Sequence, residues 1–181
     1  MAWTLGYLPP KEPDLLDVFL LSIGKALCLA NAFEAKCKHV LSVITLTDAV
    51  QAGSDFNASS ELARRVRAKF LGDTIKLIGN APDIHPTDLA ILQAAKDARN
   101  YIAHESAELG TLSDARAETI LKLFAELEPR VIEVARGDNL VSAWCYEICE
   151  GEPAPFGIQE EYVQLVSNWV FRGAPQEVAG R

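Results

Sequence analysis

Three neighbouring side chains near the middle of the chain have the right chemistry for acid–base work on a phosphodiester: Arg99, Asn100 and His104. A histidine side chain takes up or releases a proton near neutral pH. The planar guanidinium of an arginine matches two oxygens of a phosphate group. An asparagine amide can orient an imidazole or donate a hydrogen bond to a phosphate oxygen. No other segment brings a base, a phosphate-binding cation and an amide this close together.

Cleavage of RNA without a metal requires little beyond these groups. A base removes the proton from the ribose 2′-OH, which attacks the adjacent phosphorus, and a cation stabilises the charge that grows on the non-bridging oxygens. The sequence therefore suggests His104 as the base, Arg99 as the oxyanion stabiliser and Asn100 as the residue that orients the imidazole or binds phosphate. We expect neither a metal ion nor a cofactor.

Helix geometry complicates this assignment. On a straight α-helix, residues five positions apart point about 140° away from each other, and residues four apart differ by about 40°. Asn100 and His104 therefore share a face, whereas Arg99 points toward the predicted buried side. Either the helix distorts or ends near Ala103, or a second subunit completes the site.

A structural role is the alternative for the same residues. Arg99 would then pair with a carboxylate, such as Asp97 or Glu105, and His104 would cap the end of its helix. The chain would in that case be a non-catalytic helical module that binds a protein partner or a nucleotide. A helical enzyme that binds a small molecule is a third option, for which the sequence holds no motif.

The spacing from Arg99 to His104 resembles the Arg-x4–6-His signature of HEPN domains, a helical superfamily that includes many metal-independent ribonucleases. The resemblance covers the motif and a compatible run of helices, residues 14–137. It implies an all-α fold, an up-and-down bundle of five or six helices, and a homodimer in which two motifs face a shared groove. It also implies RNA as the substrate and a role as a toxin or phage-defence effector, with an antitoxin or another protein as partner.

Basic residues cluster on a helix that we expect to run from Ser59 or Ser60 to Ile78. Arg65, Lys69 and Lys76 would lie within about 40° of one another on it. Together with Lys96 they are candidate contacts for an RNA backbone; a solvated helix face is the alternative. The predicted buried stripe of this helix consists of Leu62, Val66, Phe70 and Leu77.

The other expected helices follow from apolar residues at three- and four-residue spacing. A long first helix covers residues 14–49, and the helix with the motif begins near Thr87. Ser113 caps a further helix that Pro129 kinks or restarts and that stops at Gly137, with its arginine neighbour in a cationic last turn. Residues 140–149 fit a helix or a short strand, and 158–171 form the last helix. We expect one helical domain over residues 1–172 and a flexible tail over 173–181.

Composition narrows the function further. The 181 residues carry a net charge of −8, and such a field opposes sequence-independent attraction to nucleic-acid phosphates. Any RNA contact must therefore rest on a local basic site, and the charge disfavours high-affinity binding to DNA. Glycine-rich phosphate loops, a Gly-x-Ser-x-Gly elbow and a His-Glu-x-x-His motif are all absent.

The four cysteines and the apolar segments indicate a cytoplasmic protein. Cys28, Cys37, Cys145 and Cys149 match no zinc-binding spacing, and we expect structural thiols in a reducing compartment. The first residues lack the basic start of a secretory signal. The most apolar window, residues 18–33, contains Lys25 and falls short of the roughly 20 residues that a membrane span needs. We therefore expect no membrane association.

Overall fold

The computed structural model describes residues 10–53, 55–82, 84–106 and 114–175. These residues form six α-helices and no strand, which confirms the all-α prediction. The helices are α1 (Pro13–Gln51), α2 (Phe56–Arg67), α3 (Leu71–Ile78), α4 (Pro86–His104), α6 (Ala117–Glu150) and α7 (Phe156–Val170). The predicted cap at Ser113 and most of the predicted tail, residues 176–181, lie outside the described residues. Residues 140–149, for which helix and strand were both open, are helical.

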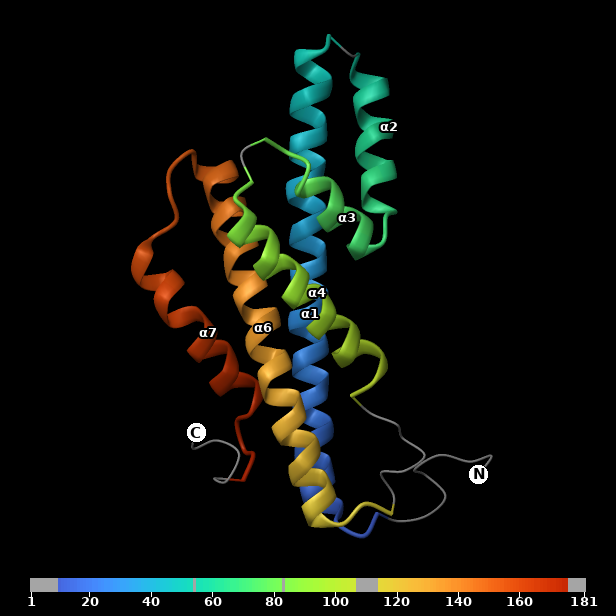
Figure 1. Cartoon of the computed structure of the whole chain (residues 1–181), viewed down its shortest axis with the longest axis vertical. Coiled ribbons are helices and arrows are strands. Elements are labelled where there is room, and N and C mark those ends of the chain that lie inside the picture. The colour runs from blue at the N-terminus through green and yellow to red at the C-terminus, as the bar shows by residue number, and fades with distance from the viewer. Residues whose placement is uncertain (1–9, 54, 83, 107–113, 176–181) are drawn as a thin grey trace, which may run out of the picture.

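The long helix α1 is the axis of the molecule (Figure 1). It contacts every other described helix. The helix α6 lies beside it and runs in the same direction, while α4 crosses both obliquely and α7 runs back along α6. The four long helices thus alternate in direction along the chain, and α2 and α3 flank the C-terminal part of α1.

The core forms where the apolar side of α1 meets α6. The ring of Phe19 packs edge-on against Phe124, with centroids 5.0 Å apart, and Phe124 packs in turn against Phe171 at 6.4 Å. By length and composition α1 could also cross a membrane. The helix has 39 residues and is longer than the apolar window 18–33 of the sequence. In this fold the other described helices pack against it.

The helix α6 is longer than predicted, because neither expected break occurs. It continues through Pro129 and past Gly137 to Glu150. Gly137 is buried, and a Cβ built there would lie 2.4 Å from the Ala95 Cβ of α4 and 3.0 Å from Phe33 Cε2 of α1. The stop predicted at Gly137 is wrong: the residue is a glycine because three helices meet there.

The single helix predicted up to Ile78 is also wrong. The chain leaves α2 at Arg67 and enters α3 at Leu71. On one continuous helix Val66 and Ile75 would point about 180° apart, yet both are buried in the core. The break rotates α3 so that both reach it. Phe70, predicted to be buried, is 83% exposed in the connection.

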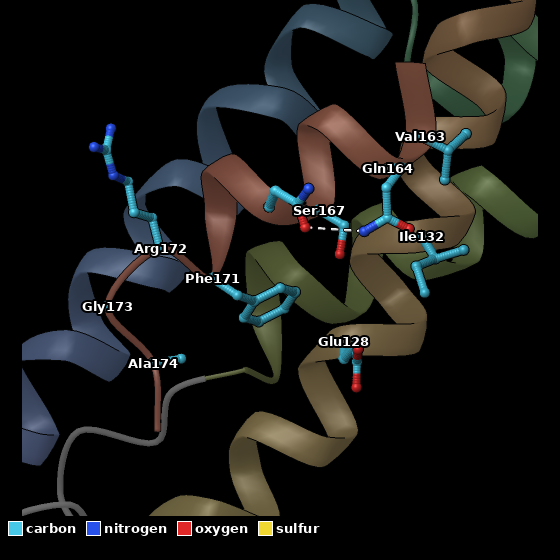
Figure 2. Close-up of a pocket in the computed structure, with 10 residues that line it drawn as sticks. Glu128, Ile132, Val163, Gln164, Ser167, Phe171, Arg172, Gly173 and Ala174 are labelled. Atoms are coloured by element: carbon cyan, nitrogen blue, oxygen red, sulfur yellow. Dashed lines mark hydrogen bonds between the residues drawn. The ribbon is translucent and has the colours of Figure 1, made fainter. Parts of the chain in front are cut away.

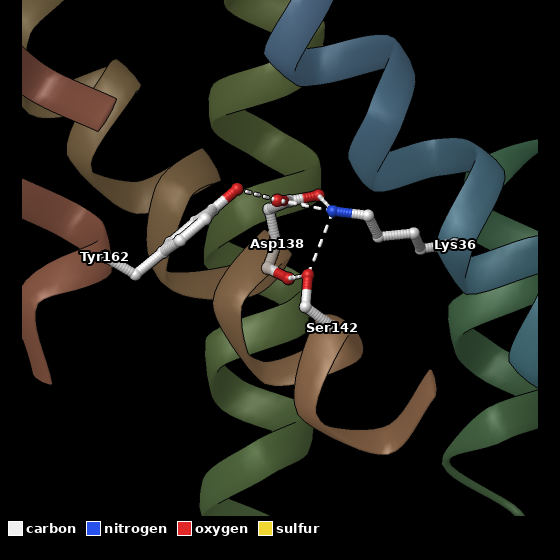
Figure 3. Close-up of polar contacts among 4 residues, drawn as sticks. All are labelled: Lys36, Asp138, Ser142 and Tyr162. Carbon is white, nitrogen blue, oxygen red and sulfur yellow. Dashed lines mark hydrogen bonds and ion pairs between the residues drawn. The ribbon is translucent and has the colours of Figure 1, made fainter. Parts of the chain in front are cut away.

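A buried ion pair ties α1, α6 and α7 together (Figure 3). The Nζ of Lys36 donates to both carboxylate oxygens of Asp138, at 2.9 and 2.8 Å, and to Ser142 Oγ at 2.9 Å. The hydroxyl of Tyr162 donates to the same carboxylate. Burial, together with this hydrogen bond, raises the pKa of Tyr162. A fully buried carboxylate requires such partners, because leaving one unpaired costs several kcal/mol (about 3–5).

Two glycine substitutions should separate close packing from helix propensity. We expect Gly137→Ala to lower the free energy of unfolding by about 1–3 kcal/mol, because the new methyl group overpacks the contact with Ala95 and Phe33. Gly24→Ala, on the exposed side of α1 with nothing within 4 Å of its Cβ, should raise it by about 0.5–1 kcal/mol. Urea denaturation followed by circular dichroism measures both. Equal stabilisation by the two substitutions would show that Gly137 is not a packing requirement.

Candidate functional site

A surface hollow of about 360 Å³ lies between α1, the α2–α3 connection and α4. All three predicted catalytic residues line it, as does Lys96. The complete lining is Glu34, Phe70, Leu71, Gly72, Lys96, Arg99, Asn100 and His104. The structure therefore brings together, within one chain, the groups that the sequence singled out.

Two other hollows lack this combination of groups. One of about 290 Å³ lies between α6 and α7 and is lined mainly by amides and apolar groups (Figure 2). Gln164 there donates to Asn168, and the Arg172 side chain points away from the centre. The other, of about 640 Å³, is mostly apolar and includes Trp144 and Ile148. Neither holds a histidine beside a cation, so the chemistry favours the hollow at α4.

The geometry of α4 explains how Arg99 and His104 reach the same hollow. At 100° per residue, Lys96 and Asn100 fall between them on the helix, so the four residues cover an arc of about 140°. The hollow spans this whole arc, and the long Arg99 side chain extends to it from one edge. His104 is the last residue of α4, in agreement with the expected helix end near Ala103, and no second subunit is needed to bring both residues to this hollow. Dimerisation itself stays a prediction.

Arg99 is held by a carboxylate from α1 that the sequence analysis did not select. Its Nη2 donates to Glu34 Oε2 at 2.7 Å, while Lys38 Nζ lies 2.8 Å from the other oxygen, Oε1. Burial alone would raise the pKa of Glu34, but the hydrogen bond from Lys38 and the charges of Arg99 and Lys38 outweigh it and hold the pKa below its ordinary value. Asp97, the partner expected for Arg99, pairs instead with Lys96 at 3.1 Å.

The charges around Glu34 leave the hollow with a positive excess. One carboxylate is shared by two cations, Arg99 and Lys38. The Nε of Arg99 is buried and has no hydrogen-bond partner, so the guanidinium does not use all its donors within the described residues.

His104 is the last residue of α4 and is exposed to solvent. Within the described part of the chain its imidazole makes no hydrogen bond, and Asn100 lies one turn before it on the same side. The imidazole is thus accessible to a ligand in the hollow. The other helix end illustrates a structural histidine: His85 Nδ1 accepts a hydrogen bond from the Thr87 amide at 3.2 Å and caps α4.

The remaining basic candidates do not line the hollow. Arg65 lies on α2 and bonds to Glu61 at 3.0 Å, Lys69 lies in the connection, and Lys76 is exposed on α3. The shared face predicted for them required one continuous helix, which the break excludes. Their contact with RNA stays a prediction, supported by charge and not by a common surface.

Three residues at or beside the hollow were not predicted from the sequence as site residues: Glu34, Lys38 and Phe70. Glu34 and Lys38 carried a signal, since an acid and a base four residues apart in an otherwise apolar helix form a pair. Phe70 carried none, because helical spacing placed it on the buried stripe. Its exposure depends on a helix break whose cause lies in tertiary packing.

The cysteines and acidic residues do not supply an alternative centre. All four thiols are free, and burial raises the pKa of Cys37. Within the described ranges, no group of three or more His, Cys, Asp or Glu residues could hold a metal ion.

Comparison with known proteins assigns no family to this chain. No family model, no curated protein and no solved structure matches the chain. The structure establishes an all-α protein with a histidine, an amide and two cations around one hollow. Any finer assignment must come from the chemistry of these groups.

Replacing Glu34 should change how stability depends on pH. A carboxyl group whose pKa is lowered by folding contributes stability above its unfolded pKa, and this contribution is lost as the pH falls through the folded pKa. The wild-type protein should thus lose stability as the pH falls below the ordinary range of a glutamate pKa. Glu34→Gln should lower the free energy of unfolding at pH 7 by about 1–3 kcal/mol, since Arg99 loses its charged partner, and should flatten the decline in acid.

Urea unfolding at pH 7 and pH 3 measures this difference. Glu118→Gln is a matched control, because Glu118 also pairs with a lysine, Lys122, but both side chains are at least 70% exposed. Solvent screens such a pair, and we expect little change in the free energy of unfolding. Identical pH dependence in the wild-type protein and Glu34→Gln would contradict a stabilising role for the Glu34 charge.

Proposed function

We propose that the protein is a metal-independent endoribonuclease of the HEPN type. The observation that carries the proposal is the placement of Arg99, Asn100 and His104 around one solvent-accessible hollow. Each has a side chain suited to one part of RNA cleavage, and Lys96 adds a further cation. The resemblance of the motif to HEPN domains points to the same activity.

The reaction would proceed by transesterification within the RNA. His104 accepts the proton of a ribose 2′-OH, and the 2′-oxygen forms a bond to the adjacent phosphorus. The bond from phosphorus to the 5′-oxygen of the next nucleotide breaks, and that oxygen takes a proton from solvent. The products are a 2′,3′-cyclic phosphate and a 5′-hydroxyl. Arg99 stabilises the charge on the non-bridging oxygens, and Asn100 orients the imidazole or binds phosphate.

Glu34 has a positioning role in this proposal. Its Oε2 accepts a hydrogen bond from Arg99 Nη2 at 2.7 Å, and the Arg99 side chain is only 20% exposed. Preorganised cations stabilise developing charge better than mobile ones, because they need no reorganisation during the reaction. Lys38 compensates the carboxylate, so that a phosphate entering the hollow meets a net positive site.

The overall charge of −8 shapes how such an enzyme acts. It disfavours non-specific adsorption of RNA. Binding would therefore depend on the cations at the hollow and on the basic candidates Arg65, Lys69 and Lys76. We propose that the protein acts as a homodimer in the cytoplasm, as a toxin or defence effector restrained by a protein antitoxin.

A non-catalytic helical module is the second candidate. The ion pair between Arg99 and Glu34 favours it, because a partly buried pair of this kind also forms where an arginine only joins two helices. In this case the hollow would not process RNA, and the protein would act through a protein partner or a nucleotide. Recovery of one stoichiometric partner without RNA in a pull-down would support it.

Alanine variants at the two motif residues test the proposed activity. Arg99→Ala and His104→Ala should each reduce RNA cleavage by about 10²- to 10⁴-fold, because each removes a group that acts in the transition state. Cleavage of a broad RNA panel in EDTA, with detection of the 2′,3′-cyclic phosphate, is the measurement. Sedimentation and circular dichroism should show an unchanged dimer and fold.

His39→Ala provides the matched control, since His39 is an exposed histidine of α1 that does not line the hollow. It should cleave RNA at the wild-type rate. Wild-type protein that leaves the whole panel intact, with or without Mg²⁺, would refute the ribonuclease. Alanine variants that change stability and no activity would support the non-catalytic module.

A further inference from the structure

Phe70 presents an aromatic ring to solvent at the lining of the hollow. At 83% exposure it is the most exposed large apolar side chain in the described part of the protein. It lines the same hollow as Lys96, Arg99 and His104. A single exposed apolar residue is ordinary on a protein surface, so its position beside these polar groups is what requires an explanation.

Local structure does not explain a phenylalanine at this position. Phe70 is the N-cap of α3 and makes no side-chain capping bond. Serine, threonine, aspartate and asparagine stabilise a helix at the N-cap, because their side chains accept a hydrogen bond from the first amides. A phenylalanine offers no acceptor there. The residue thus contributes neither to the cap nor to the core.

The backbone at Phe70 is nevertheless held in place. The carbonyl of Phe70 accepts hydrogen bonds from the Thr74 amide at 3.0 Å and from Thr74 Oγ1 at 3.1 Å. The next residue, Leu71, is only 5% exposed and belongs to the core. The backbone that carries the ring is thus held in place, so a ligand that covers the ring restricts only its side-chain torsions.

The neighbours of Phe70 in the hollow include a glycine and two cations. The neighbouring hollow-lining residue is a glycine, Gly72, and a Cβ built there would have Lys96 Cδ at 4.0 Å as its nearest contact. Lys96, Arg99 and His104 line the rest of the hollow. An aromatic face is thus combined with cations in one site, as in surfaces that bind single-stranded nucleic acids.

We propose that Phe70 stacks against an unpaired nucleobase next to the scissile phosphate, and that the substrate is therefore single-stranded RNA. This inference rests on the proposed function of the hollow. Bases in a duplex are already stacked on their neighbours and do not offer a free face, whereas loops and single strands do. Stacking is tolerant of base identity, because every base has a π-face. Phe70 therefore selects for strandedness and not for sequence.

Substitutions at Phe70 test the stacking directly. Phe70→Ala should raise KM for a single-stranded oligoribonucleotide by about 5- to 100-fold while kcat stays within about twofold, and Phe70→Trp should restore the wild-type KM. A substrate with an abasic nucleotide at the stacked position should be bound equally by the wild-type protein and by Phe70→Ala. Phe156→Ala is the control, since Phe156 is 72% exposed but lies on α7, away from the hollow; its KM should match the wild-type value.

Binding of a 2′-O-methyl oligoribonucleotide, measured by fluorescence anisotropy, separates this inference from the ribonuclease. If the wild-type protein cleaves no RNA but binds this probe in a Phe70-dependent way, stacking holds and the ribonuclease fails. If the wild-type protein cleaves RNA and Phe70→Ala leaves KM unchanged, stacking is overturned and the ribonuclease stands. If the wild-type protein neither binds nor cleaves, both are overturned. If Phe70 instead contacts a protein, Phe70→Ala should lose that partner protein from the pull-down.

Discussion

The close approach of three helices at Gly137 determines the geometry of the candidate site. Ala95 of α4 and Phe33 of α1 both meet the glycine of α6 at distances that leave no room for a side chain. Arg99 follows Ala95 by one turn, and Glu34 follows Phe33 directly. The apolar contact thus fixes the separation of α1 and α4 at the level where Arg99 and Glu34 form their ion pair. A polar site on the surface depends on dense packing in the layer below it.

A short charged stretch in the middle of α1 serves two regions at once. Glu34 pairs both with Lys38, four residues later, and with Arg99 of α4. Lys36 lies between them in sequence and points to another side, where it binds the buried Asp138 of α6. Residues two apart on a helix differ by about 160°, so one turn of α1 anchors both the hollow and the contact with α6 and α7. This explains why charged residues are tolerated within this long, largely apolar helix.

The sequence predicted the helical class and most helix positions, because these depend on local periodicity. Its errors occurred where tertiary contacts decide. Gly137 has the sequence pattern of a helix stop but is a packing position, and the break before Leu71 satisfies burial of Val66 and Ile75 together. Projection on a helical wheel separated Arg99 from His104, since it ignores the length of the arginine side chain. Glu34 lies 65 residues from Arg99, and no local pattern links them.

The helix α2 has few anchors, and this has a kinetic consequence. Among its described side chains only Ser59 and Val66 are buried, and α2 lies beside the outer end of α1 (Figure 1). Segments with so little burial open locally at a free energy well below that of global unfolding, and their amide hydrogens exchange early. The α3 side of the connection stays docked through Leu71. The molecule therefore has one wall of the hollow that is rigid, formed by α1 and α4, and a neighbouring helix able to detach without unfolding the core.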